Sequence, residues 1–382
     1  MFLVSLMFLT LALALPWPLQ AQPPGLPTQY TLATLGRASR TVALEHPGRH
    51  GSLAVADLTD DGAIACTVEV GERNVAARCR AGSPPQLLGT LTPGVDSFAL
   101  GIDDGTLIGY SFDGNFVNHA WQWTEATGMV DINGGMAVSI AMSVRGPFIG
   151  GFCVAAAGAQ PCLWVAGVPH ILGTLGRTGE GASVTVSGGL AGSYRTATGE
   201  THALILDETR SPRDIHPGEA LNSRAIALTA AGQALGNATG PGALRQAFLY
   251  DAATGPVLIA ADPQWQVHEG HALGSGLAIG NGIRKVAPLG QRAWRCALPC
   301  SPPNVPEDLS PLVSDPGHTW VLYDGVAINN GGQILAYGTR DGSADWAVLL
   351  TPVGPGARAP KKTKHEQKDK QRWHAEREEE RD

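Results

Sequence analysis

Two pairs of histidines are the first candidates for catalytic or metal-binding residues in this sequence. His119 and His202 begin the triplets His-Ala-Trp and His-Ala-Leu, whereas His268 and His271 stand in the segment His-Glu-Gly-His. A zincin motif needs two histidines four residues apart on one face of a helix, and the second pair is three apart beside glycines. We therefore expect no metal site here, and we expect His119 and His202 to form hydrogen bonds within their own structural units.

Two acidic clusters, DLTDDG at 57–62 and DDG at 103–105, could supply carboxylate oxygens to calcium. Neither fits the 12-residue calcium loop. Asp-Gly pairs also supply the positive φ of hairpin turns, which is our interpretation of both clusters and of the NNGG segment at 329–332. The glycine-rich segment 274–280 lacks the third glycine of a dinucleotide-binding loop, so we interpret it as a turn as well.

Familiar catalytic signatures are missing: the sequence has no G-x-S-x-G elbow, Walker loop, C-x-x-C-H haem site or sialidase-type Asp box. It therefore nominates no catalytic residue and no cofactor. Residues scattered over several repeat units can still build an active site without leaving such a signature. An enzyme consequently remains an alternative, because fold alone does not decide function.

The six cysteines fall into three local pairs: Cys66 with Cys79, Cys153 with Cys162, and Cys296 with Cys300. The first two pairs flank apparent hairpins, in which neighbouring antiparallel strands bring two Cα atoms to the roughly 5.5 Å that a disulfide needs. The third pair would close a very short loop. We predict three disulfides, with free core thiols or a metal site as the alternatives, although zinc-type spacing is absent.

The N-terminal segment predicts export. Residues 1–15 form a short apolar run and Ala21 is a small residue suited to signal-peptidase cleavage, so we predict a signal peptide at residues 1–21. A buried strand or an uncleaved anchor is the alternative, because the usual positively charged start is missing. No later segment stays apolar for the 18 residues of a membrane span. We expect a secreted or periplasmic protein with no membrane span after cleavage.

The charge balance argues against nucleic acid as a partner. Lys and Arg number 27 against 34 Asp and Glu, which gives a net charge of −7 and repels a phosphate backbone. Residues 354–382 carry a dense mixture of both charges and a single large apolar residue, Trp373. Such a composition cannot bury a core, so we predict a charged, disordered tail at 354–382.

Composition and an internal repeat together predict the fold. The 382 residues include 49 Gly and 27 Pro, which disfavour helices and favour short strands and turns. A turn followed by a short apolar strand recurs with anchors at Gly62, Gly105, Gly146, Gly189, Gly232, Gly282 and Gly332. Spacings of 41 to 50 residues match one four-stranded propeller blade. We predict an all-β fold over residues 22–353, a β-propeller with seven four-stranded blades.

Both ends of the repeat array support a closed ring. Residues 30–36 look like an isolated fourth strand, while the last repeat stops after its third strand. The N-terminal strand would then complete the last blade, which removes exposed sheet edges. Small residues such as Ser139 mark the first strands, and aromatics such as Trp121 in the third strands would fill the gaps between blades. The poorly marked sixth unit, residues 271–325, leaves six or eight blades as alternatives.

Several segments of the array share one pattern. They are the third-strand segments NHAWQW, THALIL and RQAFLY, the exits LLGTL and ILGTLG, the opening YTLATLG, and the closing WVLYDGVAINNGGQILAYG followed by AVLLTPV. Over residues 28–353 they resemble the HAF family of bacterial extracellular repeats, named after a His-Ala-Phe triplet. The first unit departs from this triplet, with AARC at 76–79. The resemblance implies an exported, propeller-like bacterial protein of unassigned biochemical role.

Three classes of function follow from these expectations. The first is a monomeric, non-catalytic scaffold that binds a protein or a polysaccharide on one face of the ring. The second is an extracellular glycan hydrolase or lyase, which would need carboxyl groups with raised pKa values converging on the central channel. The third is a structural repeat protein without a ligand. Exposed aromatics on connecting loops, of which Trp265 is a candidate, would favour the scaffold.

Overall fold

The computed structural model describes residues 27–38, 53–176, 178–259, 264–285, 289–300, 305–343 and 345–353. The predicted signal peptide (1–21) and the predicted tail (354–382) lie outside the described residues. The regular structure of the described residues is almost entirely β-strand. The segments η2 (Pro241–Ala243) and η3 (Ser310–Leu312) are short 3-10 helices. No helix in the described ranges is long and apolar enough to cross a membrane.

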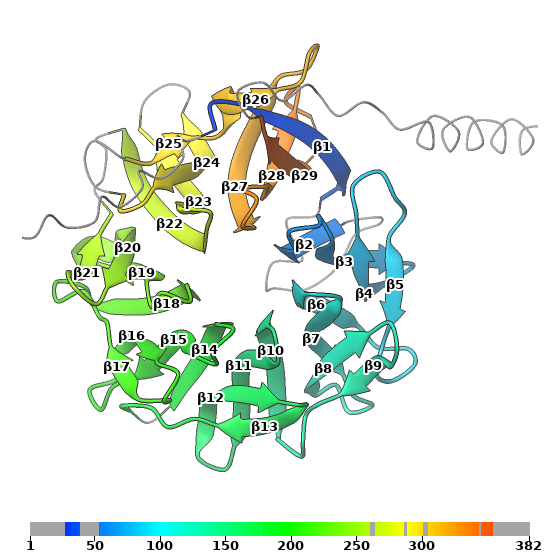
Figure 1. The fold of residues 1–382 in the computed structure, drawn as a ribbon, viewed down its shortest axis with the longest axis vertical. Coiled ribbons are helices and arrows are strands. Elements are labelled where there is room, and N and C mark those ends of the chain that lie inside the picture. The colour runs from blue at the N-terminus through cyan, green and yellow to red at the C-terminus, as the bar shows by residue number, and fades with distance from the viewer. Residues whose placement is uncertain are drawn as a thin grey trace, which may run out of the picture.

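Four-stranded antiparallel blades follow one another around a central axis (Figure 1). Blade 1 contains β2 (Leu53–Leu58), β3 (Ile64–Val70), β4 (Arg73–Cys79) and β5 (Gln86–Gly89). Blade 2 contains β6 (Ser97–Asp103), β7 (Thr106–Phe112), β8 (Asn118–Thr124) and β9 (Gly128–Asp131). Blade 3 contains β10 (Val138–Arg145), β11 (Phe148–Ala155), β12 (Gly158–Val165) and β13 (Val168–Ile171). Blade 4 contains β14 (Thr178–Val184), β15 (Leu190–Arg195), β16 (Thr201–Leu206) and β17 (Pro212–Asp214).

The next two blades share one eight-stranded sheet, because a single parallel bridge joins Gln246 to His268. Blade 5 contains β18 (Asn222–Leu228), β19 (Ala234–Thr239), β20 (Arg245–Asp251) and β21 (Gly255–Leu258). Blade 6 contains β22 (Trp265–Gly274), β23 (Leu277–Arg284), β24 (Gly290–Ala297) and β25 (Glu307–Asp308). The described chain thus confirms a blade in the poorly marked sixth unit, and seven blades in all once the ring closes.

The N-terminal strand closes the ring as the sequence predicts. Blade 7 contains β27 (Trp320–Ile328), β28 (Ile334–Arg340), β29 (Asp345–Pro352) and β1 (Tyr30–Arg37). β1 pairs antiparallel with β29, from Tyr30 opposite Pro352 to Arg37 opposite Trp346. A further short strand, β26 (Val313–Ser314), pairs in parallel with the outer edge of β1. The closing strand is therefore covered on both edges at its N-terminal end, which leaves less unpaired backbone exposed.

The alternating strand directions sort the connections onto two faces. The turns between first and second strands, and between third and fourth strands, lie on what we call the turn face. The loops that join consecutive blades, and the turns between second and third strands, lie on the opposite face, the connection face. This division follows from the antiparallel order of every blade.

Six of the seven predicted anchor glycines lie in turns that precede the second strand of a blade, and the seventh, Gly282, is wrong. Gly62, Gly105, Gly146, Gly232 and Gly332 have positive φ in turns between first and second strands. In blade 4 the positive φ belongs to Gly188 rather than Gly189. In blade 6 it belongs to Gly276, while the predicted anchor Gly282 lies inside β23. Gly282 was misassigned because a second glycine-rich segment, GNG at 280–282, imitates a turn.

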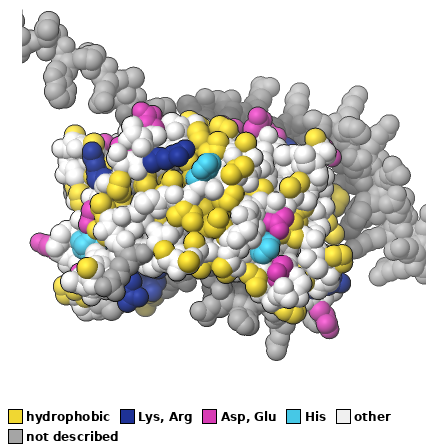
Figure 2. Space-filling view, turned by 90° about the horizontal axis from the view of Figure 1, so that it is seen from below, with side chains coloured by type: hydrophobic (Ala, Val, Ile, Leu, Met, Phe, Trp, Pro, Cys, Tyr) yellow, Lys and Arg dark blue, Asp and Glu magenta, His cyan; other side chains and the backbone are white. Residues whose placement is uncertain are grey.

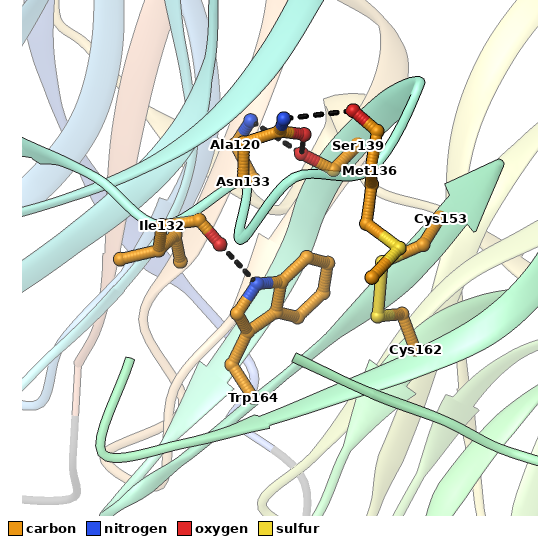
Figure 3. The surroundings of a disulfide bond; sticks show 8 residues. All are labelled: Ala120, Ile132, Asn133, Met136, Ser139, Cys153, Cys162 and Trp164. Carbon is orange, nitrogen blue, oxygen red and sulfur yellow. Dashed lines mark hydrogen bonds between the residues drawn. A yellow bond between two sulfur atoms is a disulfide. The ribbon is translucent and has the colours of Figure 1, made fainter. Parts of the chain in front are cut away.

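Small first-strand residues tie neighbouring blades together. In Figure 3, the Ser139 hydroxyl accepts the backbone N–H of Ala120 at 2.9 Å and donates to the Asn133 side chain at 2.5 Å. Ser97 and Ser223 accept the corresponding alanine N–H groups of the preceding blades at 2.9 Å. The third-strand residues Ala76, Ala120 and Ala203 therefore have their buried N–H groups satisfied from the next blade, a need that favours serine at the partner positions.

Third-strand aromatics fill the space between blades, as predicted. Trp121, Trp164 and Trp294 are fully buried. The indole N–H of Trp164 donates to the carbonyl oxygen of Ile132 in the preceding blade at 2.7 Å (Figure 3). The Trp294 N–H likewise donates to the Asn281 carbonyl oxygen at 2.8 Å, so Trp164 and Trp294 each combine a large buried apolar area with one directional hydrogen bond.

Two of the three predicted disulfides are present. Cys66 and Cys79 join β3 to β4 with their Cα atoms 5.9 Å apart, and Cys153 and Cys162 join β11 to β12 at 5.6 Å. Both bonds link residues diagonally across a strand pair, since Cys66 lies opposite Ala77 and Cys162 opposite Gly151. Disulfides of this kind are typical of oxidising compartments.

The third predicted disulfide stays a prediction. Cys296 and Cys300 are both buried, and they are not among the bonded pairs. Contact with the Cys296 sulfur, together with burial, raises the pKa of the Cys300 thiol.

Candidate functional site

A β-bulge in every first strand determines what lines the central channel. Each of the first strands β2, β6, β10, β14, β18, β22 and β27 contains an extra residue relative to its partner strand, and β22 and β27 contain a second one, Gln266 and Tyr323. One bulge recurs at the equivalent position in all seven blades, and its extra residues, which we call the bulge ring, are Ala56, Leu100, Met142, Ala182, Ile226, His271 and Val326. All seven are partly exposed, whereas the residue before each is buried. A bulge re-aims a side chain, and here it places one per blade in the channel.

The bulge ring forms the inner end of a cavity that extends to the turn face. The cavity has a volume of about 580 Å³. It is bounded by all seven first strands and reaches the turns at Asp60, Ser275 and Asn330. Sequence reasoning missed this site, because a bulge is a one-residue offset without a turn signature.

His271 is the one bulge-ring residue that is not aliphatic. Its Nδ1 lies 2.9 Å from the Asp324 carboxylate and 3.1 Å from the Gly325 carbonyl oxygen, both in blade 7. The amide nitrogen of Asn281 lies 3.4 Å from Nε2 and 3.3 Å from Asp324. Burial lowers the pKa of His271, but the hydrogen bond and charge of Asp324 outweigh it and raise the pKa. The imidazole is thus held in one orientation across the join between blades 6 and 7.

His268 and His271 do not form a pair. His268 is buried between blades 5 and 6, where its Nδ1 accepts the backbone N–H of Ala247 at 3.1 Å, whereas His271 lines the channel. His268 thereby takes the place that serine holds in other blades. Within the described ranges, no group of three or more His, Cys, Asp or Glu side chains could hold a metal ion.

His268 should make the fold sensitive to acid. Burial lowers its pKa to about 4, against about 6.5 in an unfolded chain. Between those values the unfolded state binds the proton more tightly, so stability falls as the pH drops from 6.5 to 4, by about 3 kcal/mol in all. We expect His268→Ser to remove this contribution. Urea unfolding at pH 7 and pH 5 should show a smaller loss in the variant, and equal losses would contradict the assignment.

His119 and His202 form hydrogen bonds within their blades, as predicted. The Nδ1 atom of each lies 2.8 Å from a fourth-strand carboxylate, that of Asp131 and Asp214 respectively. In blade 4 the His202 ring also stacks on His216 at 3.8 Å between centroids. Both histidines bind the third strand of their blade to the fourth.

The two acidic clusters form turns, as predicted. Gly62 and Gly105 have φ values of 78° and 77°. Asp61 accepts a hydrogen bond from the Thr59 hydroxyl and pairs with Arg80 at 2.7 Å, and these bonds lower its pKa to about 2. The segment 274–280 likewise contains the turn between β22 and β23.

The turn-face mouth of the cavity carries an ion pair that spans three blades. Arg145 of blade 3 contacts Asp57 of blade 1 at 3.0 Å. The side chain of Asp103, in the intervening blade 2, accepts the backbone N–H of Gly146 at 2.6 Å. The charges of Asp57, Asp103 and Asp60 raise the pKa of Arg145. Three carboxylates therefore share one guanidinium at the mouth.

The candidate aromatic Trp265 is buried, and its indole N–H donates to the Pro306 carbonyl oxygen at 3.2 Å. The exposed aromatic of the described chain is instead Phe116, in the turn between β7 and β8 on the connection face, with 76% of its surface accessible. Its φ of 62° is unusual for a bulky side chain. The Asp113 carboxylate fixes this turn by accepting the backbone N–H groups of Asn115 and Val117 at 2.7 and 2.9 Å.

Three further aromatics extend inward from Phe116. The Phe112 ring lies 6.4 Å from that of Phe116, Tyr110 lies 6.3 Å from Phe112, and Phe98 stacks on Tyr110 at 4.8 Å. We call these four residues the aromatic series. It runs from the first strand of blade 2 out to an exposed turn, so Phe116 has an apolar backing.

The exposed apolar residues of the outer rim are aliphatic rather than aromatic. Figure 2 shows apolar side chains gathered across one side of the ring, and exposed rim residues include Val130 of β9 and Val168 and Ile171 of β13. These are single aliphatic side chains on strands of four residues. Edge strands as short as these resist pairing with other chains.

A closed ring of seven four-stranded blades around a lined channel defines a β-propeller. No protein-family model and no curated protein matches the chain. Among solved structures, the chain is similar to a puromycin-hydrolyzing peptidase from Mycobacterium tuberculosis, with 14% identity and a TM-score of 0.51 over 86% of this chain and 57% of that one. This chain thus spans little more than half of the peptidase.

Two other solved propellers are similar to it. One is the β-propeller domain of the Trilobed protease from Pyrococcus furiosus, with 7% identity and a TM-score of 0.45 over 68% of this chain and 84% of that one. The other is the six-bladed lectin of Aleuria aurantia, with 10% identity and a TM-score of 0.38 over 70% of this chain and 97% of that one. At such identities the likeness shows the fold alone.

Proposed function

We propose that this protein is an exported, monomeric, non-catalytic binding scaffold that holds a protein or polysaccharide on its connection face. The observation that carries the proposal is Phe116, a large apolar side chain that is 76% exposed and held at a positive φ. Backbone strain of this kind concentrates at binding and catalytic sites. Aromatic anchors dominate binding surfaces, and a turn fixed by Asp113 reduces the entropy lost on binding.

The carboxyl groups support binding over glycan hydrolysis or lysis. A glycosidase keeps one carboxyl group protonated by raising its pKa. Six described carboxyl groups have a shifted pKa, and in all six it is lowered: Asp61, Asp113, Asp207, Asp214, Asp251 and Asp341. The aromatic series in turn favours a binding role over that of a structural repeat without a ligand.

Export belongs to the same proposal. The two disulfides and the apolar N-terminal run are both expected of a secreted or periplasmic protein. The resemblance to HAF repeats points in the same direction. Cleavage after Ala21 is checked by the N-terminal residue of protein recovered from outside the cytoplasm.

Substitution of Phe116 should separate binding from stability. Phe116→Gly removes the anchor and also relieves the positive φ, so we expect unchanged or slightly higher stability, by up to about 1 kcal/mol. Leu289→Ala is the matched control, because Leu289 is 68% exposed and precedes the third strand of blade 6 on the same face.

The readout is quantitative capture of exported proteins and of a panel of surface polysaccharides by the purified chain. We expect a partner retained by the wild type and by L289A to lose at least tenfold in affinity with F116G. If every retained partner binds F116G as tightly as the wild type, the connection face is not the binding surface.

A further inference from the structure

The central cavity is a second site, independent of the aromatic series on the opposite face. Its volume of about 580 Å³ is within the range of small-ligand sites and far above that of one water molecule. The cavity opens at the turn face, where the lining residues Asp60 and Asn330 are exposed. A small molecule can therefore enter without any rearrangement of the blades.

The inner part of the cavity is aliphatic. Leu100, Met142, Ile226 and Val326 project from the bulge ring and are only partly buried. An aliphatic chain placed against them would remove apolar surface of both partners from water, which is favourable. These four side chains have no aromatic neighbour in the bulge ring, so they fit a flexible chain better than a flat ring system.

The mouth has more negative than positive charge. Asp60 accepts hydrogen bonds from the Asn330 backbone N–H at 2.8 Å and its side-chain amide at 3.0 Å, both neutral groups. Asp103 accepts the backbone N–H of Gly146, and Arg145 is committed to Asp57. Within the described contacts, Asp57, Asp60 and Asp103 thus share the single charge of Arg145, which leaves an excess of negative charge at the mouth. A cleft lined by one sign of charge concentrates ligands of the other sign.

We propose that the central cavity binds a small amphipathic organic cation, with its aliphatic chain against the bulge ring and its ammonium group beside Asp60 and Asp103. Ammonium–carboxylate hydrogen bonds are stronger than those between neutral groups. A carboxylate ligand of the same length would be repelled by the excess negative charge of the mouth. An alcohol would gain the apolar contact but not the charge.

Methyl NMR of the full-length chain tests both the ligand class and its location. The sequence has five methionines, of which Met142 lies in the bulge ring, while Met129 and Met136 lie elsewhere in blade 2 and the loop after it. Protein labelled with 13C at the methionine methyls is titrated with octylamine, sodium octanoate or octan-1-ol. We expect octylamine to shift the Met142 signal with saturation, to leave Met129 and Met136 in place, and to bind at least tenfold more tightly than octanoate.

Charge-neutral variants identify the recognising groups. The D60N/D103N variant should bind octylamine at least tenfold more weakly than the wild type. The control E125Q/E200Q changes the net charge by the same amount at residues outside the cavity lining, and its affinity for octylamine should not change. The proposal is overturned if octanoate binds as well as octylamine, if D60N/D103N binds octylamine normally, or if no probe shifts Met142 at millimolar concentration. Circular dichroism of each variant confirms that a lost signal is not lost folding.

Discussion

Removal of residues 28–36 is expected to abolish cooperative folding of the whole ring. The deletion takes away most of β1, which pairs along its length with β29. Tyr30 within it is fully buried, and its hydroxyl accepts a hydrogen bond from Arg295 of blade 6 at 2.9 Å. Blade 7 would lose its fourth strand and the Tyr30–Arg295 contact with blade 6 together. Most domains are stable by only about 5–15 kcal/mol, so we expect the loss of a whole closing strand to unfold the ring.

Thermal unfolding followed by near-ultraviolet circular dichroism would show the effect. The truncated chain should have no cooperative transition, while a chain that lacks residues 354–382 should unfold as the full-length protein does. Equal tolerance of the two deletions would refute closure through β1. A ring that keeps its transition but shifts it by only a few degrees would place β1 outside the cooperative unit.

Gly280→Ala is expected to destabilise the protein strongly. A Cβ atom at position 280 would lie 1.8 Å from the Glu269 carbonyl oxygen and 2.9 Å from the Trp294 ring. The bulge at His271 brings the backbone of β22 this close to β23. Neither neighbour can move freely, because Glu269 contributes backbone and Trp294 is fully buried. Overpacking of this severity costs about 3 kcal/mol.

Gly173→Ala supplies the control, since no atom lies within 4 Å of the Cβ it would add and its φ is not positive. Urea unfolding midpoints of the two variants should differ by the full cost at Gly280. If Gly280→Ala unfolds at the wild-type urea concentration, the bulge geometry of blade 6 is wrong.

The repeat predicted the architecture because turns and third strands have local signatures. The geometry of a blade favours a glycine at positive φ in the turn before the second strand, and an alanine followed by a large side chain in the third strand. Both features therefore recur from blade to blade. The misplaced anchor Gly282 shows the limit of this reasoning. Gly282 belongs to β23, in which Gly280 is required because a Cβ atom there would collide with the Glu269 carbonyl oxygen. Sequence alone does not distinguish a glycine required by such a close approach from a glycine required by a turn.

The candidate sites could not be predicted from the sequence, for a different reason. Arg145 and Asp57 are 88 residues apart and belong to blades that are not adjacent in the chain, so no local pattern connects them. Phe116 and Trp265 both follow polar or turn residues, yet one is exposed and the other buried. Their exposure depends on which neighbouring blade or loop covers them. The local cysteine pairs were predictable because adjacent strands alone decide their distance.

The bulge ring separates the chemistry of the channel from the stability of the fold. Its seven positions hold six different residue types, among them alanine, methionine and histidine, in blades of the same architecture. Six of these side chains line the cavity and are partly exposed, so a substitution there need not disturb the packing between blades, whereas His271 also bonds to blade 7. The scaffold therefore offers six independently variable positions around one axis, through which selection or an engineer could change what the channel accepts while the propeller stays the same.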